Sequence, residues 1–389
     1  MSTLTLRSKI FTITIIGIAG VGCSNSITQA PTLSTEVTWS DECTPEPIKQ
    51  TKSISNIFGE KIPTESLDTY IDQRMEKLKM AGISIAIINE GNVVFHRTKG
   101  VKNINSNEKL NGCSIFQGAS ITKPLFAYFV MTFVDDGSLN LDTPLYQYLP
   151  YPDIAHDERY KKITARMAIN HQTGFPNWRT DYDKKNLFIQ FEPGSDFHYS
   201  GEGYQYLSLV LQKIAGVDHS GLEKLFQERV AKPLSMRHTQ VIPDTNLLSR
   251  MALPHNQKRQ LVKVITSNSF EDFGAAYGVH SEALDFSKWL IALMNLKGLS
   301  EASFKEYFDT QKAPKKPALI ERLKGLEGRS LGFSIFKLGD AKIYGHDGNN
   351  PGYSSLIAFN TEKKWGIVVF SNTNQRSKFG QDIIEFLHK

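Results

Sequence analysis

The order of the secondary-structure patterns along the chain constrains its fold most strongly. Apolar runs typical of β-strands lie near both ends, and helical periodicities fill the middle. The predicted strands are 83–88, 93–97, 331–337, 342–344, 354–359 and 366–371. Strands from the two ends can bury their apolar faces by pairing in one antiparallel sheet, with the helices as an insertion and as covering layers.

Helical spacing of apolar residues predicts helices at 65–80, 123–135, 164–170, 202–214, 222–230, 281–294 and 380–387. We therefore predict an α+β fold, an α/β sandwich in which helices flank an antiparallel sheet built from both chain ends. The folded domain is predicted at 61–389, with a mostly helical insertion at about 120–320. Residues 23–60 are rich in Ser, Thr, Pro and Glu, which predicts a flexible tether.

Residues 1–22 have the layout of an export signal. Arg7 and Lys9 precede an apolar run at 10–21. This run is shorter than the roughly 20 residues of a membrane-spanning helix, so we expect cleavage rather than a permanent span. Cys23 stands where bacterial lipoproteins carry their lipidated cysteine, although Gly20 departs from the usual Leu. The mature protein is expected in the periplasm or outside the cell, free or anchored to the outer membrane through Cys23.

Composition narrows the possible partners and cofactors. The net charge of +5 is spread along the chain, which favours a solvated surface over a nucleic-acid site. Cys43 and Cys113 either form a disulfide in an oxidising compartment or remain unpaired small apolar residues. Three widely spaced cysteines lack the spacing of zinc ligands. We expect no metal, no cofactor and a monomer.

A serine three residues before a lysine occurs three times. The pairs are Ser106 and Lys109, Ser120 and Lys123, and Ser334 and Lys337. Ser106 lies in a polar stretch that predicts a loop unsuited to a rigid site. Ser334 lies in a predicted strand, where residues three apart point to opposite faces and cannot act together. Ser120 is the remaining candidate nucleophile.

Ser120 opens a predicted helix whose residues 124–130 are apolar almost all round, so this helix must be buried. Lys123 lies on the same helical face as Ser120. Burial lowers the pKa of a lysine, and the neutral amine can accept the proton of the serine. The helix N-terminus also favours a developing alkoxide. On this motif alone, an alternative stays open in which Ser120 only caps the helix and Lys123 reaches solvent.

Two later motifs give these residues a context. They are Phe-His-Tyr-Ser-Gly at 197–201 and Tyr-Gly-His-Asp-Gly at 344–348. With Ser-x-x-Lys, in this order and spacing, they resemble the serine β-lactamase and penicillin-binding-protein superfamily. The resemblance is to its class C-like branch, which also includes esterases and D-amino-acid peptidases. It extends from about residue 65 to the end of the chain.

The resemblance implies roles for individual residues. Tyr199 would lie beside Ser120 and Lys123, helping to deprotonate the serine and to protonate the leaving group. Because a phenol normally has a pKa near 10, this role requires a nearby cation. His171 would be structural, ending a helix beneath the site.

Further residues would bind the substrate. His346 would line the site from a strand, and Gly348 would allow close approach of the backbone. The backbone N–H groups of Ser120 and Asn349 would form the oxyanion hole, and Tyr277 would edge the substrate cleft. On their own residues, His346 and Tyr277 are equally compatible with packing roles.

The sequence departs from this family at two recognition positions. Gly201 replaces the asparagine of Tyr-x-Asn, which orients an acylamino group, and His346 replaces the lysine that helps to recognise a carboxylate. We therefore expect an acyl-serine hydrolase acting on an ester, a D-amino-acid amide or a cell-wall peptide. The alternatives are a true β-lactamase or D-alanyl-D-alanine carboxypeptidase, and an inactive protein that binds peptidoglycan fragments.

Overall fold

The computed structural model describes residues 48–182, 186–262, 271–311 and 325–388. All of them belong to the unit Asp41–Lys389. The predicted signal peptide, Cys23 and Cys43 lie outside the described residues. Within the described ranges, no helix combines the length and the apolar character needed to cross a membrane.

An antiparallel sheet is the centre of the fold, and its strand order is β5-β4-β3-β12-β11-β10-β9-β8. The N-terminal strands are β3 (Gly82–Asn89), β4 (Asn92–Asn103) and β5 (Glu108–Lys109). The C-terminal strands are β8 (Leu326–Arg329), β9 (Ser334–Leu338), β10 (Ala341–Asn350), β11 (Tyr353–Asn360) and β12 (Trp365–Ser371). The two groups join where β3 pairs with β12, with Ile85 opposite Val369. The predicted sheet built from both chain ends is confirmed.

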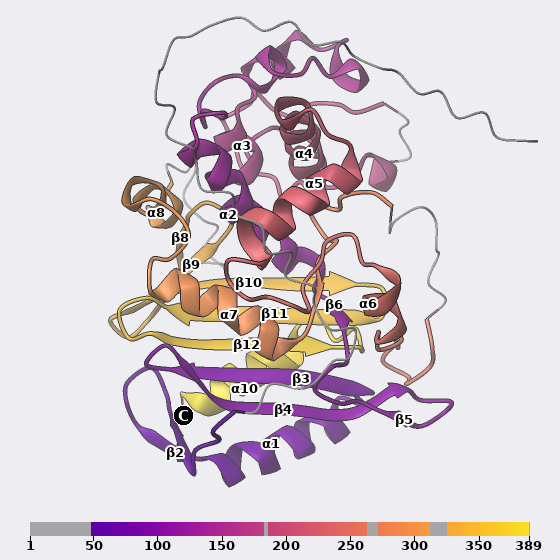
Figure 1. The fold of residues 1–389 in the computed structure, drawn as a ribbon, viewed down its shortest axis with the longest axis vertical. Coiled ribbons are helices and arrows are strands. Elements are labelled where there is room, and N and C mark those ends of the chain that lie inside the picture. The colour runs from indigo at the N-terminus through magenta and orange to yellow at the C-terminus, as the bar shows by residue number, and fades with distance from the viewer. Residues whose placement is uncertain (1–47, 183–185, 263–270, 312–324, 389) are drawn as a thin grey trace, which may run out of the picture. The chain divides into compact units, whose positions relative to one another are not determined.

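Both faces of this sheet are covered, which explains the continuous apolar run in β3. Ile85 and Ile87 pack with Leu67 of α1 (Thr64–Lys77) and Ile383 of α10 (Lys378–Leu387). The alternate residues of β3 belong to the second core, on the side of the inserted helices. Figure 1 shows α7 (Ala283–Met294) lying across the sheet, α1 below β4, and the inserted helices from α2 (Thr122–Asp135) to α5 (His219–Phe226) gathered above β10.

The inserted region is mainly helical, as predicted. Its helices are α2 (Thr122–Asp135), α3 (Ala165–Ile169), α4 (Gly201–Ala215), α5 (His219–Phe226), α6 (Thr245–Ser249), α7 (Ala283–Met294) and α8 (Glu301–Phe308). Helix α2 is buried from Thr122 to Met131, as its apolar sequence requires. A two-stranded pair, β6 (Phe116–Gln117) with β7 (His280–Ser281), joins the segment before α2 to the segment before α7.

The folded unit begins earlier than the predicted boundary at residue 61. Strand β1 (Ser53–Ser55) pairs with β2 (Lys61–Pro63), and Ile54 and Ile57 are buried with 0% and 2% exposure. The predicted tether therefore does not extend to residue 60. Burial of these two isoleucines stabilises the folded conformation of this segment. The mostly polar composition of the stretch gives no sign of this contribution.

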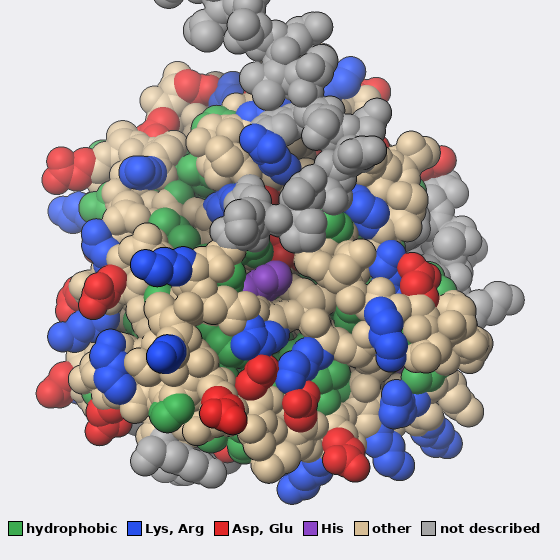
Figure 2. Space-filling model, turned by 60° about the horizontal axis from the view of Figure 1, so that its bottom comes forward, with side chains coloured by type: hydrophobic (Ala, Val, Ile, Leu, Met, Phe, Trp, Pro, Cys, Tyr) green, Lys and Arg blue, Asp and Glu red, His purple; other side chains and the backbone are tan. Residues whose placement is uncertain are grey.

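Charged side chains of both signs are mixed on one face of the described part of the molecule. Figure 2 shows Lys and Arg interspersed with Asp and Glu over the face that it presents. This face has no extended region of one charge, in agreement with the spread of charge along the sequence.

Candidate active site

Ser120 lies in a 3₁₀ turn, η1 (Ala119–Ile121), directly before α2. Ala119 has a φ of 49°, a left-handed conformation that costs about 1–3 kcal/mol outside glycine. Thr122 holds this turn, because its hydroxyl donates to the Ala119 carbonyl at 2.6 Å and accepts from the Val279 amide at 3.0 Å. The nucleophile candidate is therefore fixed by contacts from two separate parts of the chain.

Lys123 is buried with 1% exposure, so the alternative in which it reaches solvent is wrong. Its Nζ lies 3.3 Å from Ser120 Oγ and donates to the Ala276 carbonyl at 2.8 Å. Burial lowers the pKa of Lys123 to about 7, and the charge of Asp347 only partly opposes this effect. A neutral amine is thus accessible near neutral pH, within hydrogen-bond reach of the serine.

Tyr199 lies in the loop before α4, and its ring centre is 4.5 Å from Lys123 Nζ. Its hydroxyl lies near the Ser120 side chain. Burial raises the pKa of Tyr199, and the interaction with Ser120 only partly opposes this. The structure therefore brings the three residues together, but it keeps the phenol protonated rather than ionised by a neighbouring cation.

His171 packs behind Tyr199, a contact that the sequence did not predict. The two ring centres are 4.4 Å apart, and His171 Nδ1 accepts a hydrogen bond of 3.1 Å from the Ser200 amide. Burial lowers the pKa of His171 well below its usual value, so the ring is neutral. His171 also has a φ of 60° at the end of α3, which agrees with its predicted place at a helix end.

The end of β10 that lies against the Ser120 segment is not paired with β9. The β9 pairing ends at Gly345, whereas β11 pairs with β10 as far as Asn350. A Cβ atom at Gly348 would lie 2.8 Å from the Ser120 amide nitrogen and 2.4 Å from the Gly118 carbonyl oxygen. Only glycine fits there. The predicted oxyanion donors, the amides of Ser120 and Asn349, therefore come from chain segments that lie against each other.

His346 lies on β10 with its ring centre 6.3 Å from that of Tyr199. Its Nδ1 is 2.7 Å from the Asp347 carbonyl oxygen. Because a carbonyl only accepts hydrogen bonds, Nδ1 carries the proton and Nε2 is left as an acceptor. Burial lowers the pKa of His346 to about 4. At neutral pH this residue does not supply the positive charge of the family's lysine.

Tyr277 directly follows Ala276, whose carbonyl accepts from Lys123. Its ring lies 5.7 Å from the ring of Trp178, edge to face. Trp178 also covers Gly201, since a Cβ atom there would lie 2.5 Å from the indole ring. Trp178 was not predicted from the sequence, because no local pattern links it to position 201.

One group among the described residues has the donors of a metal site: His238, Glu282 and Asp285. However, Asp285 already accepts from the amides of Arg237 and His238, at 2.9 and 2.8 Å. Glu282 caps α7 by accepting from its first-turn amides. These contacts fit a role in fixing the start of α7.

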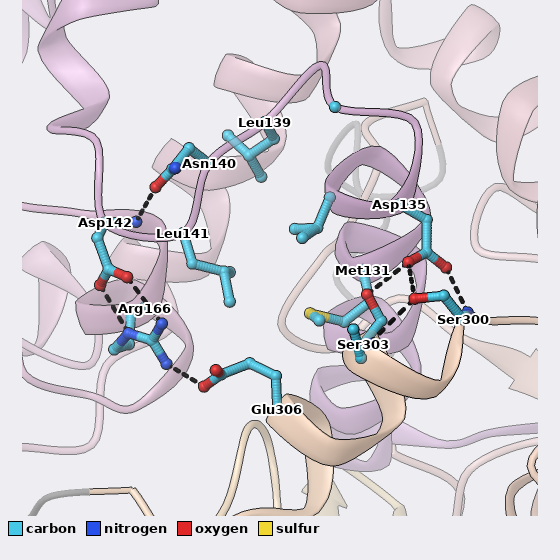
Figure 3. A pocket seen from close by; sticks show the side chains of 13 residues that line it. Met131, Asp135, Leu139, Asn140, Leu141, Asp142, Arg166, Ser300, Ser303 and Glu306 are labelled. Atoms are coloured by element: carbon cyan, nitrogen blue, oxygen red, sulfur yellow. Dashed lines mark hydrogen bonds and ion pairs between the residues drawn. The ribbon is translucent and has the colours of Figure 1, made fainter.

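A separate cavity of about 520 Å³ lies at the other end of α2. Figure 3 shows it between Asp135, bonded to Ser300 and Ser303, and Arg166, which bridges Asp142 and Glu306. Helix α2 rises about 1.5 Å per residue, so this cavity is roughly 20 Å from Ser120. Arg166 is already paired with two carboxylates, and Asp135 already accepts from two serine hydroxyls, so we assign no chemistry to this cavity.

The fold and this arrangement of Ser120, Lys123 and Tyr199 define the serine β-lactamase and penicillin-binding-protein class. Residues 67–388 match the Beta-lactamase family, and the chain belongs to that family. Protein flp of Staphylococcus aureus (strain MW2) is 23% identical over 345 residues. The match covers 83% of this chain and 66% of that relative.

Two solved structures share the fold. The octameric penicillin-binding protein homologue from Pyrococcus abyssi has a TM-score of 0.69 at 21% identity, covering 84% of this chain and 77% of that one. The D-alanine carboxypeptidase AmpC from Burkholderia cenocepacia has a TM-score of 0.66 at 18% identity, covering 83% and 99%. At these identities the likeness extends to the fold alone.

Proposed function

We propose that this protein is a hydrolase that forms an acyl-enzyme on Ser120 and cleaves an ester or an amide. The observation that carries the proposal is the placement of Lys123 Nζ 3.3 Å from Ser120 Oγ, in a buried setting that lowers the lysine pKa to about 7. Tyr199 adds a protonated hydroxyl near the same serine. A surface serine with a helix-capping role would need neither neighbour.

In the proposed acylation, neutral Lys123 takes the Ser120 proton as Oγ bonds to the substrate carbonyl carbon. The carbonyl oxygen becomes an oxyanion that accepts from the backbone N–H groups of Ser120 and Asn349. As the intermediate collapses, the leaving group takes a proton from Tyr199, which is restored from the Lys123 ammonium. Water then attacks the acyl-enzyme while neutral Lys123 takes the proton of the water, and Lys123 returns this proton to Ser120 Oγ as the bond between Oγ and the acyl carbon breaks.

The recognition residues favour substrates other than typical β-lactams. Neutral His346 offers a hydrogen-bond acceptor where family members use a cation for a carboxylate. Gly201 has no side-chain amide that could bind an acylamino group. An ester, a D-amino-acid amide or a cell-wall peptide therefore fits the site better. The AmpC structure keeps a second candidate open, because that neighbour is described as a D-alanine carboxypeptidase.

The central test is active-site labelling. A fluorophosphonate probe should label the wild type and fail to label Ser120→Ala, and penicillin, short esters and D-amino-acid amides should then compete to different extents. Turnover of a chromogenic cephalosporin or a cell-wall pentapeptide would favour the second candidate. Failure of the folded wild type to be labelled or to turn over any of these substrates would favour the inactive peptidoglycan-binding alternative.

We also propose export, with a lipid on Cys23 holding the protein at the outer membrane. The support is the signal-like pattern at 1–22 followed by cysteine. When the whole sequence is expressed, metabolic labelling with a palmitate analogue should label the wild-type protein and leave the Cys23→Ser variant unlabelled. Secretion of an unlipidated wild type would show free export instead. The expected partners remain small esters or peptides, including peptidoglycan fragments, and the expected state is monomeric.

A further inference from the structure

The space over Gly201 is occupied by an indole ring. A Cβ atom at this glycine would lie 2.5 to 2.9 Å from three ring carbons of Trp178. Gly201 is two residues after Tyr199, at the position where the family motif carries its asparagine. The loss of that amide is therefore accompanied by an aromatic side chain in the place that an asparagine would need.

The indole ring is one half of an aromatic pair whose other half is Tyr277. Tyr277 meets Trp178 edge to face at 5.7 Å, and both side chains are partly exposed. Tyr277 follows the residue whose carbonyl binds Lys123 Nζ at 2.8 Å. Tyr277 thus belongs to the segment that contacts Lys123, and its partner Trp178 lies over Gly201 in the segment that carries Tyr199.

The segment that carries Trp178 is held firmly against α4. The Asn177 carbonyl accepts from the amides of Gly201 and Glu202, each at 3.1 Å. On the other side of Trp178, the Arg179 guanidinium and amide bind the Glu202 carboxylate, the amide at 3.0 Å. Glu202 is buried. An indole ring anchored on both sides offers a pre-formed surface to a ligand.

From this geometry we infer that Trp178 and Tyr277 form an apolar surface that selects substrates with an alkyl or aryl acyl group and rejects those with an acylamino group. An acylamino N–H or C=O placed against these rings would lose its hydrogen bonds to water without a replacement. An aryl group would gain stacking contacts instead. The inference rests on the proposed hydrolase function and specifies its substrate class.

The test compares two 4-nitrophenyl esters of equal length, a 5-phenylpentanoate and an N-(phenylacetyl)glycinate, each corrected for its rate with hydroxide. For the wild type we expect kcat/KM to favour the phenylpentanoate at least tenfold. Trp178→Ala should reduce this preference below threefold by slowing the phenylpentanoate. The short acetate ester, which has no phenyl group to contact the rings, should change less than threefold, and Trp178→Phe should keep most of the preference.

Fluorophosphonate labelling of Ser120 and thermal unfolding accompany each variant. A wild-type preference for the acylamino ester would overturn the inference. So would an equal loss on the phenylpentanoate and the acetate in a folded Trp178→Ala variant, since that pattern indicates a structural role. A wild type that is neither labelled nor active on any ester would overturn the hydrolase function itself, which distinguishes the two failures.

Discussion

Lys123 Nζ lies 3.3 Å from Ser120 Oγ, and burial brings the pKa of this amine to about 7. Acylation should therefore follow the neutral fraction of Lys123. We expect the rate of Ser120 labelling to rise with pH, reach half its maximum near pH 7 and level off above pH 8. Lys123→Arg, which stays protonated, should lose roughly 10²- to 10⁴-fold, the usual contribution of a general base. A flat profile between pH 5 and 9 would exclude Lys123 as the base.

The same burial should cost stability. Below about pH 7 the folded protein carries a buried ammonium, whereas above that pH the folded lysine is neutral and the unfolded chain still binds the proton up to pH 10.5. Lys123→Met should thus raise the free energy of unfolding by roughly 3–5 kcal/mol at pH 6 and by only about 1 kcal/mol at pH 9.5. Urea unfolding at both pH values measures this. Lys363→Met, at an exposed site, is the control and should show no such pH dependence.

Gly348 sets the distance between β10 and the nucleophile. Because a Cβ atom there would lie 2.8 Å from the Ser120 amide nitrogen, Gly348→Ala should displace the strand or the turn. We expect kcat/KM to fall roughly 100-fold, as a shift of about 1 Å at a reacting group does. Gly345→Ala, on the same strand with its nearest contact at 3.3 Å, is the control and should retain most activity. Equal losses in both variants would indicate general strain in β10.

The fold was predictable where burial on both faces leaves a strong signal. The apolar runs of β3, β11 and β12 have this property, and their pairing follows from the position of the helices between them. Strand β8 and helix α8 were missed. Strand β8 is a short edge strand with the sequence Leu-Glu-Gly-Arg, in which apolar residues show almost no periodicity.

The site was predictable in part. Ser120 and Lys123 are neighbours on one helical turn, so local spacing links them. Tyr199 and His346 are distant in sequence, and only the family resemblance connected them to the serine. Trp178 was not predictable, because its contact with Gly201 depends on how the segment after α3 packs on α4.

Cys113 is disulfide-bonded in the structure, so the alternative of unpaired cysteines does not hold for it. Cys43 lies outside the described residues and stays the predicted partner. Mass spectrometry of the mature protein, alkylated with and without reduction, should recover a linked pair of peptides containing Cys43 and Cys113. Replacing Cys43 with Ser should lower the free energy of unfolding by roughly 4 kcal/mol, as expected for a long closed loop. Recovery of Cys43 as a free thiol would refute this pairing.

His171 should act by positioning Tyr199 rather than by transferring protons. Its ring packs 4.4 Å from that of Tyr199, and burial keeps its pKa well below the usual value. His171→Ala should lower kcat/KM roughly 10- to 100-fold by loosening the tyrosine, with the midpoint of the pH profile unchanged near pH 7. His171→Asn suits the left-handed backbone and can still accept from the Ser200 amide, so it separates the loss of the ring from the loss of that bond. A shift of the pH midpoint in either variant would instead show that His171 takes part in the proton transfer.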